Sequence, residues 1–168
     1  MAHKTVGIDL AGREKNPTGM CTINGKDVSF STLYLDKDII EYANDTAPDI
    51  ISVDAPLMEG EIRIREGDKE LKKYGAMPLT MPSMRELCLR GRRIVKSLNA
   101  QVIEVFPTAS AKILGFYRKN YRETASILKI KVKNKHELDA YIAALTGILY
   151  LQGKTVKAGE IVIPTKPF

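Results

Sequence analysis

The chain has 168 residues, a length typical of one domain with a buried core. Hydrophobic residues make up 44% of it and charged residues 27%, which is typical of a globular protein and excludes a disordered one. Its two cysteines, Cys21 and Cys88, form no Cys-x-x-Cys pair, which argues against a disulfide framework and a cysteine zinc site.

The sequence contains no predicted membrane segment. The N-terminal MAHKTVGIDL lacks an apolar stretch of signal-peptide length. The longest apolar run, residues 140–151, is too short to span a bilayer. We therefore expect a soluble, cytoplasmic protein with no membrane partner.

The net charge of +6 is unevenly distributed. Residues 61–96 hold ten lysines and arginines against five acids, and residues 112–135 hold eight against the single acid Glu123. A basic surface suits a phosphate-rich partner such as nucleic acid. A solvated lysine-rich face, common in proteins from hot environments, explains the same charges equally well.

The chain begins with extended segments. Alternating apolar residues predict a strand over 4–12. An Asn-Gly pair at 24–25 predicts a hairpin between strands at 19–23 and 28–35. We expect a short helix over 37–46, with Asp36 as its N-cap.

The middle of the chain continues with a strand and helices. A near-continuous apolar run at 49–56 predicts a strand that is covered on both faces. Residues 58–83 are the least regular part, with a helix expected only in the second half of the segment 62–75. An amphipathic helix is predicted over 83–98, followed by a buried strand at 102–107.

The last part of the chain is predicted to be mainly helical, with helices near 108–115 and 121–130 and a short extended segment at 160–165. The segment HELDAYIAALTGILYL (136–151) predicts an apolar helix. Asn134 is a good N-cap residue for it, and Glu137 stands at the capping-box spacing.

Three predicted strands carry an acid among apolar residues: Asp9, Asp54 and Glu104. Ligands of open α/β sheets bind at the carboxyl ends of parallel strands, where we expect Asp9 and Asp54, with Asp139 on the last helix as a third wall. Neighbouring carboxylates repel one another and need a proton or a cation between them. Such all-oxygen sites suit Mg²⁺, and two metals about 3.5–4 Å apart would stabilise phosphodiester cleavage.

Each acid taken singly also has a structural explanation. Asp54, which precedes Ala-Pro, suits a turn; Glu104 could pair with a buried arginine or lysine; Asp9 could cap a loop amide. His136 could touch a metal or a phosphate, or simply be a half-exposed residue of the first helical turn. Because these acids recur on three strands and one helix, we favour a shared site.

Five segments carry a family resemblance, in this order along the chain: GIDLAG, SVDAPL, REGDKELKKYG, VIEVFPTASAKILG and HELDAYIAALTG. Together they resemble an uncharacterised family of predicted ribonuclease H-like nucleases, a domain of unknown function. The resemblance implies an α/β, ribonuclease H-like fold with a five-stranded mixed sheet of order 3-2-1-4-5 and helices on both faces. It implies one domain over 1–168 with a basic helical insertion at about 58–99.

The resemblance also implies catalytic and metal-binding roles for Asp9, Asp54 and Asp139, and for Glu104, with Mg²⁺ or Mn²⁺ as cofactor. The last helix is similar to that of Holliday-junction resolvases, which usually carry a second acid near the matched Asp. Here only Glu137 is available, and its spacing places it on a different face of the helix.

Basic residues of the insertion are candidates for substrate binding, because arginine can bind phosphate bidentately. We select Arg65, Asp68 and Arg85 there, together with Lys112 farther along the chain. The alternative for each is a surface residue in a salt bridge.

The leading hypothesis is a metal-dependent nuclease acting on DNA or RNA. One alternative is a nucleic-acid-binding protein that keeps the fold without turnover. Another is an actin-like or sugar-kinase-type nucleotide-binding enzyme, which would need a glycine-rich phosphate loop where this chain has only Ala11 and Gly12. The oligomeric state stays open, with a homodimer among the alternatives.

Overall fold

A computed structural model describes residues 2–167. Its strands, within that range, are β1 (Lys4–Asp9), β2 (Thr18–Asn24), β3 (Asp27–Leu33), β4 (Ile50–Asp54), β5 (Val102–Val105), β6 (Thr155–Ala158) and β7 (Ile161–Pro164). Its helices are α1 (Asp36–Thr46), α2 (Glu66–Glu70), α3 (Pro82–Val95), α4 (Pro107–Leu114), α5 (Tyr121–Ile127) and α6 (Lys135–Leu151), with a 3-10 turn η1 (Leu71–Tyr74).

The strands form one mixed sheet of order β3-β2-β1-β4-β5-β7-β6. Strands β1, β4, β5 and β7 are parallel, whereas β2, β3 and β6 pair antiparallel to their neighbours. The α/β class and the order of the first five strands are confirmed, but the prediction of five strands is wrong. Residues 160–165 contribute β7, and β6 was missed because its four residues lack a regular apolar pattern.

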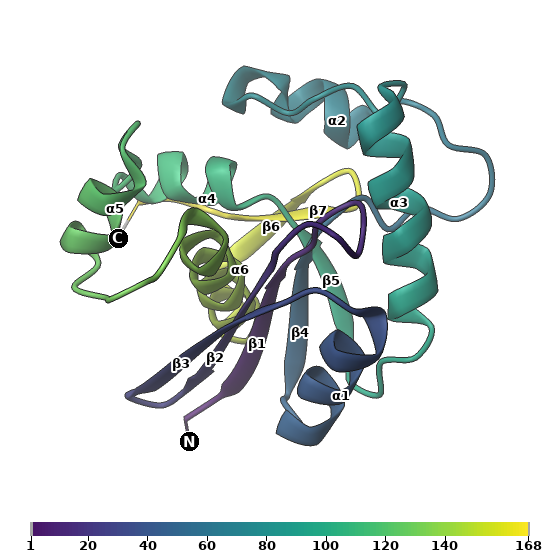
Figure 1. Ribbon diagram of the computed structural model, residues 1–168. Helices are drawn as coiled ribbons and strands as arrows, with labels where there is room; N and C mark the ends of the chain where they lie inside the picture. Colours follow the sequence, from purple (N-terminus) through teal and green to yellow (C-terminus); the bar gives the residue numbers. More distant parts are fainter. Residues whose placement is uncertain (1, 168) are drawn as a thin grey trace.

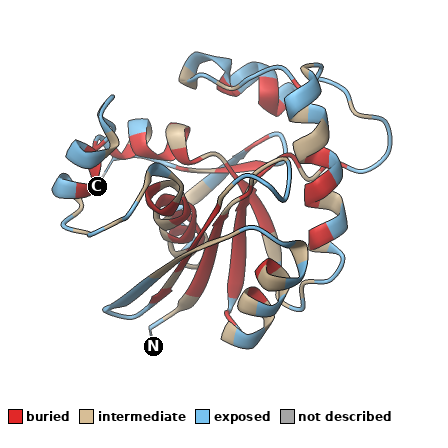
Figure 2. Ribbon diagram, in the orientation of Figure 1, coloured by how far each residue is buried: buried red, intermediate tan, exposed pale blue. Residues whose placement is uncertain are grey.

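Helices cover both faces of the sheet (Figures 1 and 2). On one face, α1 and α3 pack through Ile39 and Ile94 on apolar residues of β1 and β4. On the other, α6 crosses β1, β2 and β4. Within residues 2–167, no helix combines the length and apolarity needed to cross a membrane.

Helix α6 lies directly on the backbone of β1 and β2. A Cβ atom at Gly7 would overlap the backbone of Ala140 and Ala144, and one at Gly19 would overlap the backbone of His136. Glycine is therefore required at both positions for this close approach. The N-terminal turn of α6 is thereby held at the carboxyl end of β1.

The insertion between β4 and β5 is only partly helical. Residues 58–65 form no helix, and the helical part consists of α2, η1 and α3. Helix α3 begins at Pro82, whose fixed φ suits the first helical turn. In Figure 1, α2 lies above the carboxyl ends of the parallel strands, whereas α3 runs down beside the sheet.

Arg90 of α3 connects three separate segments. It is only 2% exposed, and its guanidinium donates to the carbonyl oxygens of Ala11 and Tyr34 at 2.7 and 2.6 Å and to Asp36 Oδ1 at 2.8 Å. Asp36 is thus an ion-pair partner inside α1, and its predicted role as N-cap is wrong, because Leu35 holds that position. Although burial opposes it, hydrogen bonds from Arg90 and Arg93 lower the pKa of Asp36.

We predict that Arg90→Met lowers the free energy of unfolding by about 3 kcal/mol, because it leaves buried acceptors without a donor. Arg93→Met, which removes an exposed partner of the same carboxylate, should cost less than about 1 kcal/mol. Because the pKa of Asp36 is lowered, the stability from its ion pairs is lost as the pH falls through that pKa. Urea denaturation should therefore show the gap between Arg90→Met and wild type narrowing in acid, and equal costs for both variants would contradict this role of Arg90.

Candidate active site

Asp9 and Asp54 end neighbouring parallel strands. They are paired in register across β1 and β4, so their side chains lie on the same face of the sheet. Both side chains line the same hollow of the surface. Asp9 and Asp54 therefore lie side by side at the carboxyl edge of the sheet, where the sequence led us to expect them.

The first turn of α6 supplies the third acid and two cations. Asn134 caps the helix by accepting from the Glu137 backbone N–H at 2.9 Å, as predicted. His136 Nδ1 lies 2.9 Å from Asp9 Oδ2, and Lys135 Nζ donates to Asp139 Oδ2 at 2.6 Å. Asp9 and Asp139 are 15% and 14% exposed, so the two carboxylates are mostly withdrawn from water, whereas Lys135 and His136 are 62% and 43% exposed.

The acids disfavour one another's ionised form. Burial, followed by the charges of Asp9 and Asp139, raises the pKa of Asp54 well above its ordinary value. Burial and the charge of Asp9 also raise the pKa of Asp139. The hydrogen bond to Asp9 raises the pKa of His136, and Asp139 raises that of Lys135 although burial opposes it. The site therefore attracts protons and other cations.

Glu104 lies on the other face of the sheet. It pairs in register with Val53, one residue before Asp54, and therefore points away from Asp9 and Asp54. Arg65 donates to both its carboxylate oxygens, at 2.8 and 2.6 Å, and the Leu57 backbone N–H donates to one of them at 2.8 Å. This geometry does not support the expected place of Glu104 among the metal ligands and matches the alternative of a buried arginine partner.

The other predicted binding residues have separate surroundings, except for Arg65 and Asp68, which pair with each other. Arg65 and Asp68 face each other through hydrogen bonds of 3.0 Å, and both side chains are 9% exposed. Lys112 donates to the Tyr74 carbonyl oxygen at 3.2 Å. Arg85 is exposed and makes no side-chain hydrogen bond or ion pair with residues 2–167. Substrate binding by Arg85 and Lys112 stays a prediction.

Glu137 does not face the site. It is 2% exposed, and its carboxylate accepts from Thr32 Oγ1 at 3.1 Å and from the Lys133 backbone N–H at 2.8 Å. It therefore joins α6 to β3 instead of completing a reciprocal capping box with Asn134. Its placement on a separate face of the helix is confirmed, so it adds no second acid beside Asp139.

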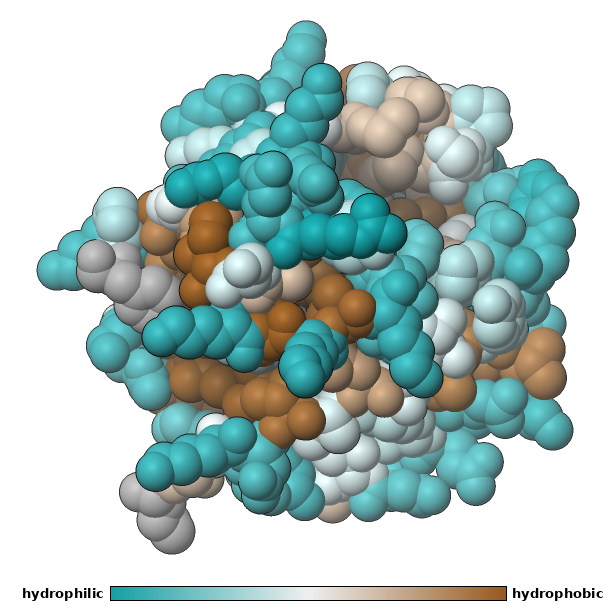
Figure 3. Space-filling model, turned by 60° about the vertical axis from the view of Figure 1, so that its left-hand side comes forward, coloured by the Kyte–Doolittle hydropathy of each residue, from teal (hydrophilic) through white to brown (hydrophobic). Residues whose placement is uncertain are grey.

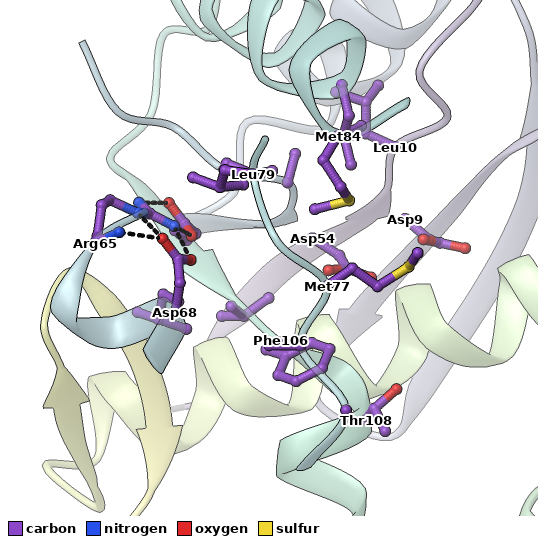
Figure 4. Close-up of a pocket in the computed structure, with 18 residues that line it drawn as sticks. Asp9, Leu10, Asp54, Arg65, Asp68, Met77, Leu79, Met84, Phe106 and Thr108 are labelled. Atoms are coloured by element: carbon purple, nitrogen blue, oxygen red, sulfur yellow. Dashed lines mark hydrogen bonds and ion pairs between the residues drawn. The ribbon is translucent and has the colours of Figure 1, made fainter. Parts of the chain in front are cut away.

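The carboxylates lie where three hollows of the surface meet. One contains Asp9, Asp54, His136 and Asp139. It shares Asp9 and Asp54 with an apolar cavity on one side (Figure 4), and Asp139 with a basic hollow on the other. Thr108, in the first turn of α4, lines all three.

Sequence reasoning missed Thr108 and Lys135 as residues of this site. Lys135 stands four residues before Asp139, a spacing at which helical side chains pair, so it could have been found. Thr108 has no such signal, because only the fold brings it to the carboxylates.

Asp9, Asp54 and Asp139 are not arranged as a complete set of metal ligands. Within residues 2–167, no three His, Cys, Asp or Glu side chains converge closely enough to hold a metal ion. Two of the three acids turn an oxygen toward a neighbouring cation, His136 or Lys135. A metal would have to compete with these partners.

Comparison with known proteins supports the fold. No family model and no curated protein matches the chain. The structure of T. thermophilus RuvC in complex with a Holliday junction substrate is 13% identical, covers 90% of this chain and 96% of its own, and has a TM-score of 0.56. Another Thermus thermophilus RuvC structure is 14% identical over 89% and 96% of the two chains, with a TM-score of 0.50.

At this level of identity, the similarity concerns the fold alone. It shows a fold similar to that of RuvC over about nine tenths of the chain, whereas the resemblance to the ribonuclease H-like superfamily stays a prediction. It gives no support for the uncharacterised family within that superfamily, because no family model matches.

We predict that Asp54→Asn raises the melting temperature by several degrees at neutral pH, because it removes a carboxylate from a repulsive cluster. The pKa of Asp54 is raised in the folded state, so wild type loses stability as the pH rises from the ordinary aspartate pKa to the raised one. The advantage of the variant should thus grow with pH across that window and vanish below it. Thermal denaturation at several pH values checks this, with the exposed Asp27→Asn as control; an advantage that is independent of pH would contradict it.

Proposed function

We propose that this protein is a metal-dependent nuclease that hydrolyses phosphodiester bonds in DNA or RNA. The observation that carries the proposal is the in-register pair Asp9 and Asp54, with Asp139 above it on α6. The similarity to RuvC supports a fold that can hold such a centre.

The donor chemistry of the site fits Mg²⁺ or Mn²⁺. Asp9, Asp54 and Asp139 offer oxygen atoms, which both cations accept. The raised pKa values of Asp54 and Asp139 indicate a deficit of positive charge among the three acids. A bound divalent cation would supply Lewis-acid activation of the phosphate and lower the pKa of the attacking water.

Protein side chains next to the acids would position the substrate. The basic hollow beside Asp139 is lined by Arg118, Lys119 and Lys135, which suit the phosphates of a strand. Figure 3 brings the side of the molecule with α5 forward and shows hydrophilic residues projecting between apolar ones. Lys135 and His136 would balance the charge of the acids while no cation is bound.

The same two residues favour a second candidate function. His136 and Lys135 already engage oxygens of Asp9 and Asp139, which is how a site without a metal would balance its charge. A nucleic-acid-binding protein without turnover is therefore the alternative, and it should bind with strong salt dependence.

We predict metal-dependent cleavage of at least one member of a labelled panel of single strands, duplexes, an RNA–DNA hybrid and a four-way junction. The junction is included because RuvC was solved with a Holliday junction substrate. Asp9→Asn and Asp139→Asn should each slow cleavage by about a hundredfold or more, because each removes a ligand. Mn²⁺ and EDTA reactions are run in parallel.

The exposed Asp45→Asn is the matched control for the charge change. Cleavage that survives EDTA or both active-site substitutions would refute the nuclease. Salt-dependent binding without cleavage would favour the alternative. Glu104→Gln in the same assay tests the role of Glu104. A loss of cleavage rate as large as that of Asp139→Asn would indicate that Glu104 is a metal ligand.

We also predict that Mn²⁺ raises the melting temperature of wild type in a concentration-dependent way, because the cation binds the folded acids in preference to the unfolded chain. Asp54→Asn should show little or none of this rise. The measurement needs no substrate, so it tests the cation site apart from catalysis. An equal rise in both proteins would place the bound Mn²⁺ elsewhere.

A further inference from the structure

An apolar cavity adjoins the carboxylates, and the proposed hydrolysis gives it no role. Its volume is about 290 Å³, close to the lower limit for small-molecule sites, about 300 Å³. Its apolar walls come from the loop after β1, the insertion and the segment after β5: Leu10, Met77, Leu79, Met84, Leu87 and Phe106. We call this cavity the methionine pocket.

The walls of the methionine pocket suit a flat ligand with apolar faces. Met77 is 49% exposed, and Figure 4 shows it in the space between Phe106 and Met84. Methionine adapts its shape and packs well on aromatic rings, and Phe106 offers a ring of its own. Leu79, at 1% exposure, closes the inner side.

The pocket is unsuited to a phosphate. Arg65 is the cation among its lining residues, and Glu104 and Asp68 already hold its guanidinium. Asp9 and Asp54 at the opposite end add negative charge. A neutral group is therefore favoured there over an anion.

The pocket and the basic hollow share a lining residue, and both adjoin the hollow that contains the acids. Thr108 borders both, and the carboxylates lie between them. A nucleic-acid strand matches these two surfaces, because its anionic phosphates suit the basic hollow and its flat, neutral bases suit the apolar pocket. With phosphates near Arg118 and Lys119 and the reacting phosphodiester at Asp9 and Asp54, the sugar next to that phosphodiester carries a base that can enter the pocket.

We propose that the methionine pocket binds an unpaired nucleobase next to the phosphodiester that is cleaved. This inference rests on the proposed function, and it narrows the substrate class to single-stranded or locally unpaired nucleic acid. In a duplex the base would first have to leave its pair and its stack, at a cost of a few kcal/mol.

Methionine methyl NMR tests the proposal without turnover. Protein with ¹³C-labelled methionine methyl groups is titrated in EDTA with a single-stranded oligonucleotide, as DNA and as RNA, its duplex, and an abasic oligomer of equal length. The single strand should shift the signals of Met77 and Met84 more than those of Met20 and Met58, which are buried and do not line the pocket. The duplex should need at least about tenfold higher concentration for the same shift.

Three outcomes would overturn the proposal: equal shifts from the abasic oligomer, equal shifts from the duplex at the same concentration, or no shift of Met77 and Met84 with any oligonucleotide. Cleavage is measured separately in Mn²⁺. Cleavage without these shifts would refute the pocket and leave the nuclease standing, whereas shifts without cleavage would refute the nuclease and leave the pocket standing.

A pair of neutral surface variants gives a second readout. Met77→Gln should weaken binding of the single strand about fivefold, because it replaces apolar contact with the base, and should leave binding of the abasic oligomer unchanged. Leu89→Gln is the matched control, since Leu89 is 43% exposed and lies outside the pocket. Equal effects of the two substitutions would contradict base binding at Met77.

Discussion

The arrangement of the site depends on the close packing of α6 against the backbone of β1 and β2. Gly7 and Gly19 place no side chain at the two points of closest approach, and Thr5 Oγ1 donates to the Ala144 carbonyl oxygen at 3.0 Å. Because the helix is fixed this closely, its first turn overhangs the end of β1, where Asp9 lies. A larger residue at either glycine would lift the helix and separate Asp139 from the acids of the strands.

The acids of two charge clusters differ in how fully neighbouring cations neutralise them. Around Arg65, the acids Asp68 and Glu104 are matched by a guanidinium that reaches both, so this cluster can be buried without an additional ion. Around Asp54, the cations Lys135 and His136 are more exposed than the acids they face. Such an imbalance lowers stability, and it is characteristic of sites whose charge serves binding or chemistry.

Local sequence signals were sufficient for some of these features and not for others. Asp9 and Asp54 could be predicted to meet because each ends an apolar strand. Glu104 resembles them as an acid within an apolar strand and matches a family acid, but the pairing register, which no local pattern encodes, turns it to the opposite face. The methionine pocket was invisible, since Met77 and Phe106 belong to different segments that only the tertiary structure joins.

The methionine pocket is assembled from the sheet, with the loops that follow its strands, and from the insertion between β4 and β5. Its acidic end belongs to the sheet, where Asp9 and Asp54 are held by strand pairing, whereas Met77, Leu79 and Met84 belong to the insertion. Substitutions in the insertion can therefore reshape the wall without disturbing the acids. Ligand preference and acidity are thereby separable properties of one cavity.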